Sequence, residues 1–166
     1  MSTVQKDLFS GMELGKVDDP MEDYADFDTI YLSEQINGDK YSGKPIMVEP
    51  FSFEIFDEKQ DRDVTKHKFR LCIIDQGAEE YLEIGINLKK EGDIQKNVRK
   101  GSVLFDLLAG LMEKKDPGSM EGFNVFKQVD LSSIRDFVNS LELMTVEVVE
   151  KTGKFNFNTI KVIDIR

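Results

Sequence analysis

At 166 residues and a net charge of −10, the chain is long enough for one domain with a hydrophobic core and rather short for two. Its single cysteine, Cys72, excludes an internal disulfide and any zinc site built from several cysteines, so we expect a reducing, intracellular compartment. The first residues lack a basic segment followed by an apolar run, and no stretch approaches the roughly 18 apolar residues of a membrane span, so we expect a cytoplasmic protein without a membrane partner.

The N-terminal segment, residues 1–36, is acidic, contains Pro20 and lacks a sustained hydrophobic period. We therefore expect a largely irregular acidic arm, followed by one domain over residues 37–166. Two interpretations of the arm stay open: a solvated terminus without a role, or a tail that recruits a partner protein or mimics DNA. The acidic residues of this segment are Asp7, Glu13, Asp18, Asp19, Glu22, Asp23, Asp26, Asp28 and Glu34.

A long first strand is predicted over residues 46–58, with an interruption near Glu49 and Pro50. Its apolar residues change parity between Val48 and Phe51, so one extra residue must enter the strand there. Proline within a strand is typical of an edge or a bulge. We therefore expect a sharply bent strand, which allows a sheet to curl around itself.

Two further strands are predicted over residues 64–74 and 81–90, joined by the short turn DQGAEE. Both alternate apolar residues with polar or charged ones, so each should bury one side and they should pair antiparallel. Besides Gly85, the outward side should carry four basic residues and a tyrosine: Lys66, Lys68, Arg70, Lys89 and Tyr81.

A helical insertion is predicted over about residues 91–140. Its first helix, over residues 101–115, has Ser102 as N-cap, and its second begins after the N-cap Asp130. Two strands then close the chain. The order β-β-β-α-α-β-β indicates a mainly β fold with a helical insertion, arranged as a five-stranded OB-fold-like barrel.

The last strand begins with two phenylalanines, Phe155 and Phe157, that alternate with asparagines. They are either core residues or a platform on which a flat ligand stacks. Buried asparagine without partners is costly, so the phenylalanine side should face inward at the start of the strand, with a bulge near Ile160.

Clustered cations beside an aromatic ring and a glycine indicate a surface for single-stranded nucleic acid, since phosphates attract positive charge and bases stack on flat groups. The alternative is the ordinary solvated side of a sheet. In the binding interpretation, the first basic strand contacts phosphates, Tyr81 stacks on a base and the loop 89–100 clamps the strand. The candidate residues are Lys66, Lys68, Arg70, Tyr81, Lys89, Lys90, Lys96, Arg99, Lys100, Phe155, Phe157 and Lys161.

A family resemblance accompanies this pattern. The stretches YSGKPIMVEPFSFEI, FRLCII, YLEIGI and GKFNFNTIKVIDI, in this order, resemble the OB-fold single-stranded-DNA-binding proteins of bacteriophages and mobile elements of Gram-positive bacteria. The resemblance covers about residues 37–166. It implies a protein of the bacterial cytoplasm that binds single-stranded DNA with little sequence preference in replication or recombination, and partners from that machinery for the acidic arm.

Signals for catalysis are weak. The only histidine, His67, lies among lysines on a strand and forms no defensible nucleophile–base pair with Cys72. There is no phosphate-binding glycine loop. We expect a non-enzymatic protein that needs no cofactor or metal. A non-catalytic protein-interaction module and a metal-dependent nuclease stay open as alternatives, and a homo-oligomer is compatible with the sequence.

Overall fold

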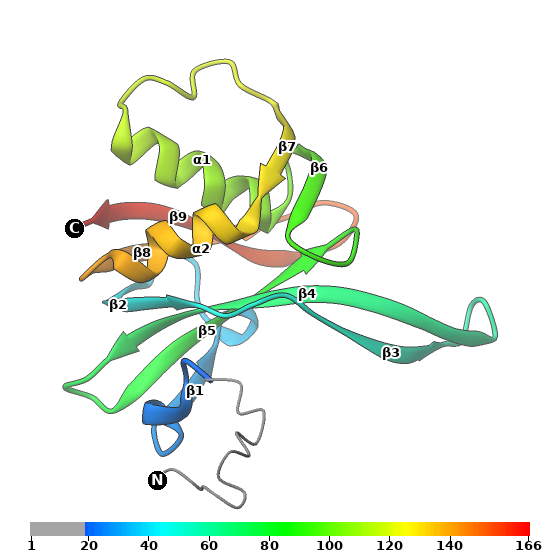
Figure 1. Cartoon of the computed structure of the whole chain (residues 1–166), viewed down its shortest axis with the longest axis horizontal. Coiled ribbons are helices and arrows are strands. Elements are labelled where there is room, and N and C mark those ends of the chain that lie inside the picture. The colour runs from blue at the N-terminus through cyan, green and yellow to red at the C-terminus, as the bar shows by residue number, and fades with distance from the viewer. Residues whose placement is uncertain (1–18) are drawn as a thin grey trace, which may run out of the picture.

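The computed structural model describes residues 19–166 and shows a mainly β protein with two α-helices in that range (Figure 1). Within the same range, neither α-helix combines the length and the apolar character that crossing a bilayer requires. The strands are β1 (Asp28–Tyr31), β2 (Lys40–Met47), β3 (Phe51–Asp57), β4 (Arg62–Asp75), β5 (Glu80–Leu88), β6 (Ile94–Arg99), β7 (Val125–Asp130), β8 (Met144–Lys151) and β9 (Phe157–Ile165), and the helices are α1 (Val103–Lys115) and α2 (Leu131–Ser140).

The larger sheet has the strand order β1-β5-β4-β2-β8-β9, with β3 paired to β4 outside this path. The interruption predicted near Pro50 is confirmed. Met47 of β2 lies opposite Leu71 of β4, and Phe51 of β3 lies opposite Lys68, so three residues of one strand face two of the other. This extra residue lets β2 and β3 follow the same neighbour as one bent strand.

The antiparallel pairing of β4 with β5 is confirmed, with Phe69 opposite Ile86 and Leu71 opposite Ile84. These side chains are fully buried in the main hydrophobic core. The core is closed by α1, which lies directly on β9: a Cβ atom added to Gly110 would come within 2.7 Å of a Val162 methyl carbon. Glycine therefore permits the close helix–strand contact.

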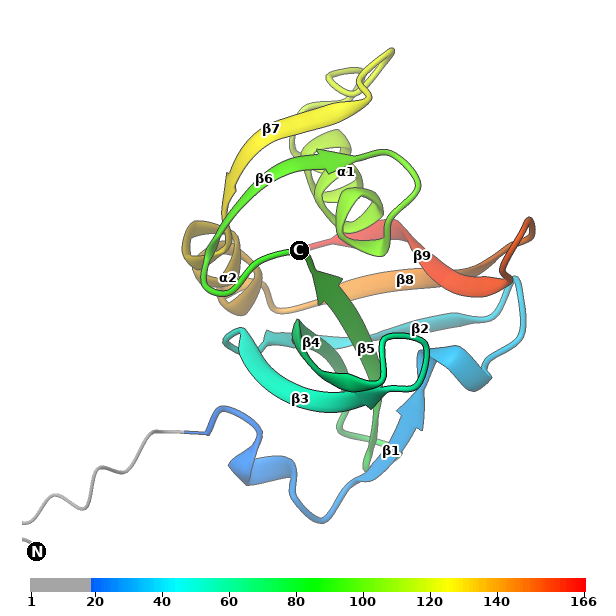
Figure 2. The ribbon, with the colours of Figure 1, turned by 90° about the vertical axis from the view of Figure 1, so that its right-hand side faces the viewer.

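Both predicted helix caps are confirmed. The side chain of Ser102 accepts a hydrogen bond from the N–H of Phe105, and that of Asp130 accepts one from the N–H of Ser132. The hydrogen bonds from Ser132 hold the pKa of Asp130 below its usual value. The insertion also contains a second, two-stranded sheet of β6 and β7 beside α1 (Figure 2).

The prediction of a loop over residues 89–100 is therefore wrong for the second half of this range, which forms β6. Asn97, with φ of 54°, interrupts the regular alternation of this strand, so its period-2 signal is weak. Its pairing partner β7 is also separated from it by all of α1. This non-local contact makes the strand hard to recognise from sequence.

The predicted five-stranded barrel is not closed. Among residues 19–166, β5 and β9 do not pair, and the free edge of β5 is occupied instead by β1, in parallel orientation, with Ile30 opposite Leu82. The prediction of a mainly β fold with a helical insertion is confirmed, whereas the prediction of a closed barrel is wrong. A strand from the segment predicted to be irregular takes the edge that closure would have required.

The N-terminal segment is more ordered than predicted over residues 19–36. It forms β1 and two short 3-10 helices, η1 (Glu22–Tyr24) and η2 (Leu32–Glu34). Met21 is buried against Ile46, Cys72 and Ile74 on the outer side of the sheet. Apolar residues between the acids thus tie this segment to the sheet, while the part of the predicted arm over residues 1–18 lies outside the described residues.

Candidate nucleic-acid interface

The β3–β4 hairpin extends from the body of the protein as a two-stranded ribbon (Figure 1). We call β3 together with residues 62–68 of β4 the ribbon. Side chains directly opposite each other in an antiparallel pair lie on the same side of the sheet. One side of the ribbon therefore carries the cross-strand pairs Phe51 with Lys68, Phe53 with Lys66, and Ile55 with Val64.

The apolar residues of this side are exposed, at 41% for Phe51, 39% for Phe53 and 49% for Ile55. The rings of Phe51 and Phe53 lie 5.9 Å apart and are inclined by 31°. Sequence reasoning missed these two phenylalanines as site residues. The alternation of these residues correctly predicts a strand. It cannot show whether another segment covers the side of the strand on which they lie.

Of the three basic residues predicted on β4, two remain available to a ligand. Arg70 forms an ion pair with Glu83, with its Nη1 atom 3.3 Å from the carboxylate. Lys66 and Lys68 have no ion-pair partner within the described part of the chain. Lys68 extends over Gly85 of β5, where an added Cβ would come within 3.1 Å of its ammonium nitrogen. The glycine thus leaves room for the lysine.

Tyr81 does not form the predicted stacking surface. Thr29 of β1 donates a hydrogen bond of 2.9 Å to its hydroxyl, and its ring packs on the buried cluster of Met21 and Ile74. The ring is half-buried. The N-terminal segment therefore occupies the part of the sheet where Tyr81 was expected to meet a base.

A groove of about 770 Å³ lies between the outer side of β4–β5 and the start of β9. It brings two predicted site residues, Lys68 and Phe157, together with Gly85 and Asn87 of β5. The acidic residues in its wall are Glu83, which holds Arg70, and Glu150. The ribbon and this groove share Lys68 and form one candidate surface.

The core interpretation of Phe155 and Phe157 is wrong, because these residues are 75% and 40% exposed. The free-energy cost of burying an asparagine without hydrogen-bond partners does not arise for Asn158, which follows Phe157. The side-chain amide of Asn158 donates hydrogen bonds of 2.8 and 2.9 Å to the carbonyl oxygens of Leu32 and Gln35. The predicted bulge near Ile160 is displaced: Ile163 is the extra residue, since Val162 and Asp164 lie opposite consecutive residues of β8.

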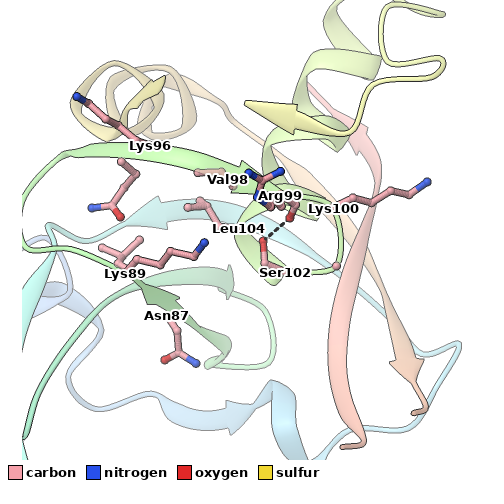
Figure 3. A pocket seen from close by; sticks show the side chains of 11 residues that line it. Asn87, Lys89, Lys96, Val98, Arg99, Lys100, Ser102 and Leu104 are labelled. Carbon is pink, nitrogen blue, oxygen red and sulfur yellow. Dashed lines mark hydrogen bonds between the residues drawn. The ribbon is translucent and has the colours of Figure 1, made fainter. Parts of the chain in front are cut away.

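A smaller pocket of about 250 Å³, which we call the α1 pocket, lies between β5, β6 and the N-terminus of α1 (Figure 3). It brings four predicted residues together: Lys89, Lys96, Arg99 and Lys100. Lys89 extends across the pocket, whereas Lys96 and Lys100 point away from it. Lys90 and Lys161 line neither hollow, as is also true of Lys66, Arg70, Tyr81 and Phe155. Lys90 is exposed, and Lys161 lies opposite Glu147 on β8.

The side chains considered for catalysis are placed apart from this surface. His67 lies on the opposite side of the ribbon, where its Nδ1 atom is 2.7 Å from the hydroxyl of Ser52. Cys72 is buried, and burial raises the pKa of its thiol to about 12, the nearby Arg70 opposing this rise. Residues 19–166 contain no group of three or more potential metal ligands of the His, Cys, Asp or Glu type.

Comparisons of the chain with protein-family models, with curated proteins and with solved structures find no match. The candidate surface therefore has to be judged from its own chemistry.

Proposed function

We propose that this protein binds single-stranded DNA with little sequence preference, on the ribbon and the adjoining groove. The observation that carries the proposal is the pairing of exposed aromatic and basic residues across two strands, Phe51 with Lys68 and Phe53 with Lys66. Each pair offers a ring on which any base can stack and an ammonium group beside it for a phosphate. These contacts read no base edge, so they favour general binding to unpaired strands.

We also propose that the fold is an open relative of the OB-fold. The bent strand of β2 and β3 pairs with β4 and, at its other end, with β8, while α1 stands between β5 and β8 along the chain. This connectivity supports the assignment, because OB-folds are partly open five-stranded barrels that bind ligands on their second and third strands. Here these strands are β4 and β5. A role in replication or recombination in the bacterial cytoplasm follows from the resemblance described above.

The proposal is tested by fluorescence anisotropy with a labelled single-stranded oligonucleotide over a range of salt concentrations. Replacing both Lys66 and Lys68 by Gln should weaken binding. It should also lower the magnitude of the log–log salt slope by about 1.4, since each single-strand phosphate contact contributes about 0.7. The matched control replaces Lys114 and Lys127, which are exposed on α1 and β7, by Gln. This control removes the same charge and should leave the slope unchanged.

Equal affinity and slope in both double variants, with both proteins folded, would reject the proposed surface. The same titration with Mg²⁺ separates the other two functions considered from the sequence. Degradation of the oligonucleotide would indicate a nuclease. Absence of any binding by the wild-type protein would favour a protein-interaction module, for which the exposed Phe and Ile side chains of the ribbon would be the contact surface.

A further inference from the structure

The α1 pocket has the charge of an anion-binding site. All the charged residues that line it are basic, and acidic residues are absent from its wall. Its apolar floor and its polar rim come from β5, β6 and the first residues of α1. The complete lining is Asn87, Leu88, Lys89, Gln95, Lys96, Val98, Arg99, Lys100, Gly101, Ser102 and Leu104.

The N-terminus of α1 opens into this pocket. Ser102 uses its hydroxyl to cap the N–H of Phe105, at 3.1 Å. Among the residues that the structure describes, the N–H groups of Val103 and Leu104 have no acceptor. Free N–H groups at the positive end of a helix favour a phosphate.

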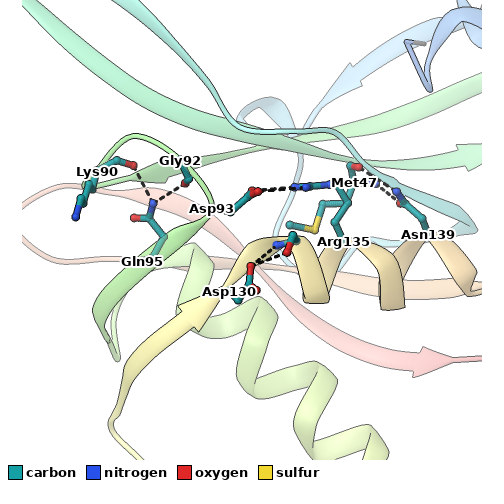
Figure 4. Close-up of polar contacts among 9 residues, drawn as sticks. Met47, Lys90, Gly92, Asp93, Gln95, Asp130, Arg135 and Asn139 are labelled. Carbon is teal, nitrogen blue, oxygen red and sulfur yellow. Dashed lines mark hydrogen bonds and ion pairs between the residues drawn. The ribbon is translucent and has the colours of Figure 1, made fainter. Parts of the chain in front are cut away.

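Gln95 supplies an independent observation. Its side chain is only 3% exposed, and its Nε2 atom donates hydrogen bonds of 2.8 Å to the carbonyl of Lys90 and 3.0 Å to that of Gly92 (Figure 4). These two acceptors decide which end of the amide is nitrogen. The Oε1 atom therefore points away from the loop, and residues 19–166 provide no donor for it. A buried acceptor without a protein partner is costly unless a ligand or an ordered water supplies the hydrogen bond.

We propose that the α1 pocket binds one nucleotide. Lys89, Arg99 and the N-terminus of α1 hold the phosphate, and a base N–H donates to Gln95 Oε1. The phosphodiester of a strand has no hydrogen-bond donor, so it satisfies the cations but not the amide oxygen, whereas a whole nucleotide satisfies both. The volume of about 250 Å³ suits a single unit of a strand and not an extended ligand.

This inference deepens the proposed function, on which it rests for the source of the nucleotide. The α1 pocket and the groove share Asn87, Gly101 and Ser102 in their walls. A strand lying on the ribbon and in the groove can therefore continue into the pocket, which then holds one of its nucleotides. The same chemistry would accept a free mononucleotide, and the experiment below separates the two sources.

The test uses the full chain, two-dimensional ¹H–¹⁵N NMR, and thymidine 5′-monophosphate and dimethyl phosphate as separate probes. The mononucleotide should shift the Gln95 side-chain amide and the backbone amides of Gly101 and Leu104. Dimethyl phosphate, which has no hydrogen-bond donor, should shift only the two backbone amides. Replacing Lys89 and Arg99 together by Gln should weaken mononucleotide binding about tenfold or more. The matched control, Lys96→Gln with Lys100→Gln, should change it less than twofold because these side chains point away.

Absence of shifts with the mononucleotide, or equal losses in both double variants, would overturn the inference. An unmoved Gln95 amide in the presence of bound mononucleotide would also overturn it, since the pocket would then be a simple anion site. The ribbon variant Lys66→Gln with Lys68→Gln should keep the mononucleotide shifts. If it loses oligonucleotide binding while the pocket shows no shifts, the proposed function stands and this inference fails. If the mononucleotide binds but oligonucleotides do not, the source is a free nucleotide and the proposed function fails.

Discussion

The outward side chains in the two halves of β4 have opposite surroundings. In the second half, the outward residues Cys72 and Ile74 are 0% and 1% exposed, because Met21 and the rest of the N-terminal segment cover them. In the first half, Lys66 and Lys68 share their side of the sheet with the exposed rings of Phe51 and Phe53. One end of β4 thus takes part in a second, smaller hydrophobic core, whereas the outward side at its other end is exposed.

An apolar residue on the outward side of a sheet therefore does not by itself indicate either a core position or a contact surface. It is core where another segment covers it, and a potential contact surface where none does. The acidic residues reinforce the division, since Asp19, Glu22, Asp23, Asp26 and Asp28 lie in or next to the covering segment. In the ribbon, by contrast, three acidic residues are balanced by three basic ones: Glu54, Asp57 and Asp63 against Arg62, Lys66 and Lys68.

The largest expected effect comes from an isoleucine-to-alanine substitution, placed once in the covered half of β4 and once in the ribbon. Ile74→Ala should lower the free energy of unfolding by about 3 kcal/mol, because it leaves a cavity between the sheet and its N-terminal cover. Ile55→Ala, at a residue that is 49% exposed, should lower it by less than about 1 kcal/mol. Urea unfolding of both variants measures the two values. Equal losses would mean that the ribbon is as well covered as the second half.

The next effect separates stacking from packing. Phe53→Ala should weaken oligonucleotide binding by about 1–3 kcal/mol and leave the salt slope unchanged, since a ring releases no counterions. Tyr81→Phe should leave binding unchanged and lower the free energy of unfolding by about 1 kcal/mol, because it removes the hydrogen bond from Thr29. Anisotropy titrations and urea unfolding of both variants test this. Loss of binding in the Tyr81→Phe variant, which keeps the ring, would show instead that the Tyr81 hydroxyl takes part in binding.

The smallest effect concerns pH and the covered half. Burial raises the pKa of Cys72 from 9.0 to about 12, so the folded state favours the neutral thiol. Its contribution to stability is therefore complete below pH 9 and is lost as the pH rises from 9 to 12. Between pH 8 and pH 10, wild-type protein should lose about 1 kcal/mol more than Cys72→Ala. Urea unfolding of both proteins at the two pH values gives this difference, and identical losses would show that the thiol titrates normally.

The residues that sequence reasoning placed correctly are those whose signals are local. Ser102 and Asp130 cap helices because each is followed by a helical period, and the change of parity at Pro50 identified the extra residue between β2 and β3. Lys66 and Lys68 were placed on the outward side of β4 for the same reason. Phe51 and Phe53 were missed although their parity was clear, since parity does not report whether anything lies over a side.

The sequence by itself determined the mainly β class, the order of the main strands and helices, and which residues of β4 and β5 face the core. These features depend on hydrophobic periods of 2 and 3.6 residues, which are visible within a short stretch of sequence. Tertiary structure decided that β1 takes the edge of β5, so the barrel stays open, and that Met21 covers Cys72 and Ile74 while the ribbon stays bare. Such contacts join residues some 50 positions apart along the chain, as Thr29 and Tyr81 do, and no local pattern encodes them.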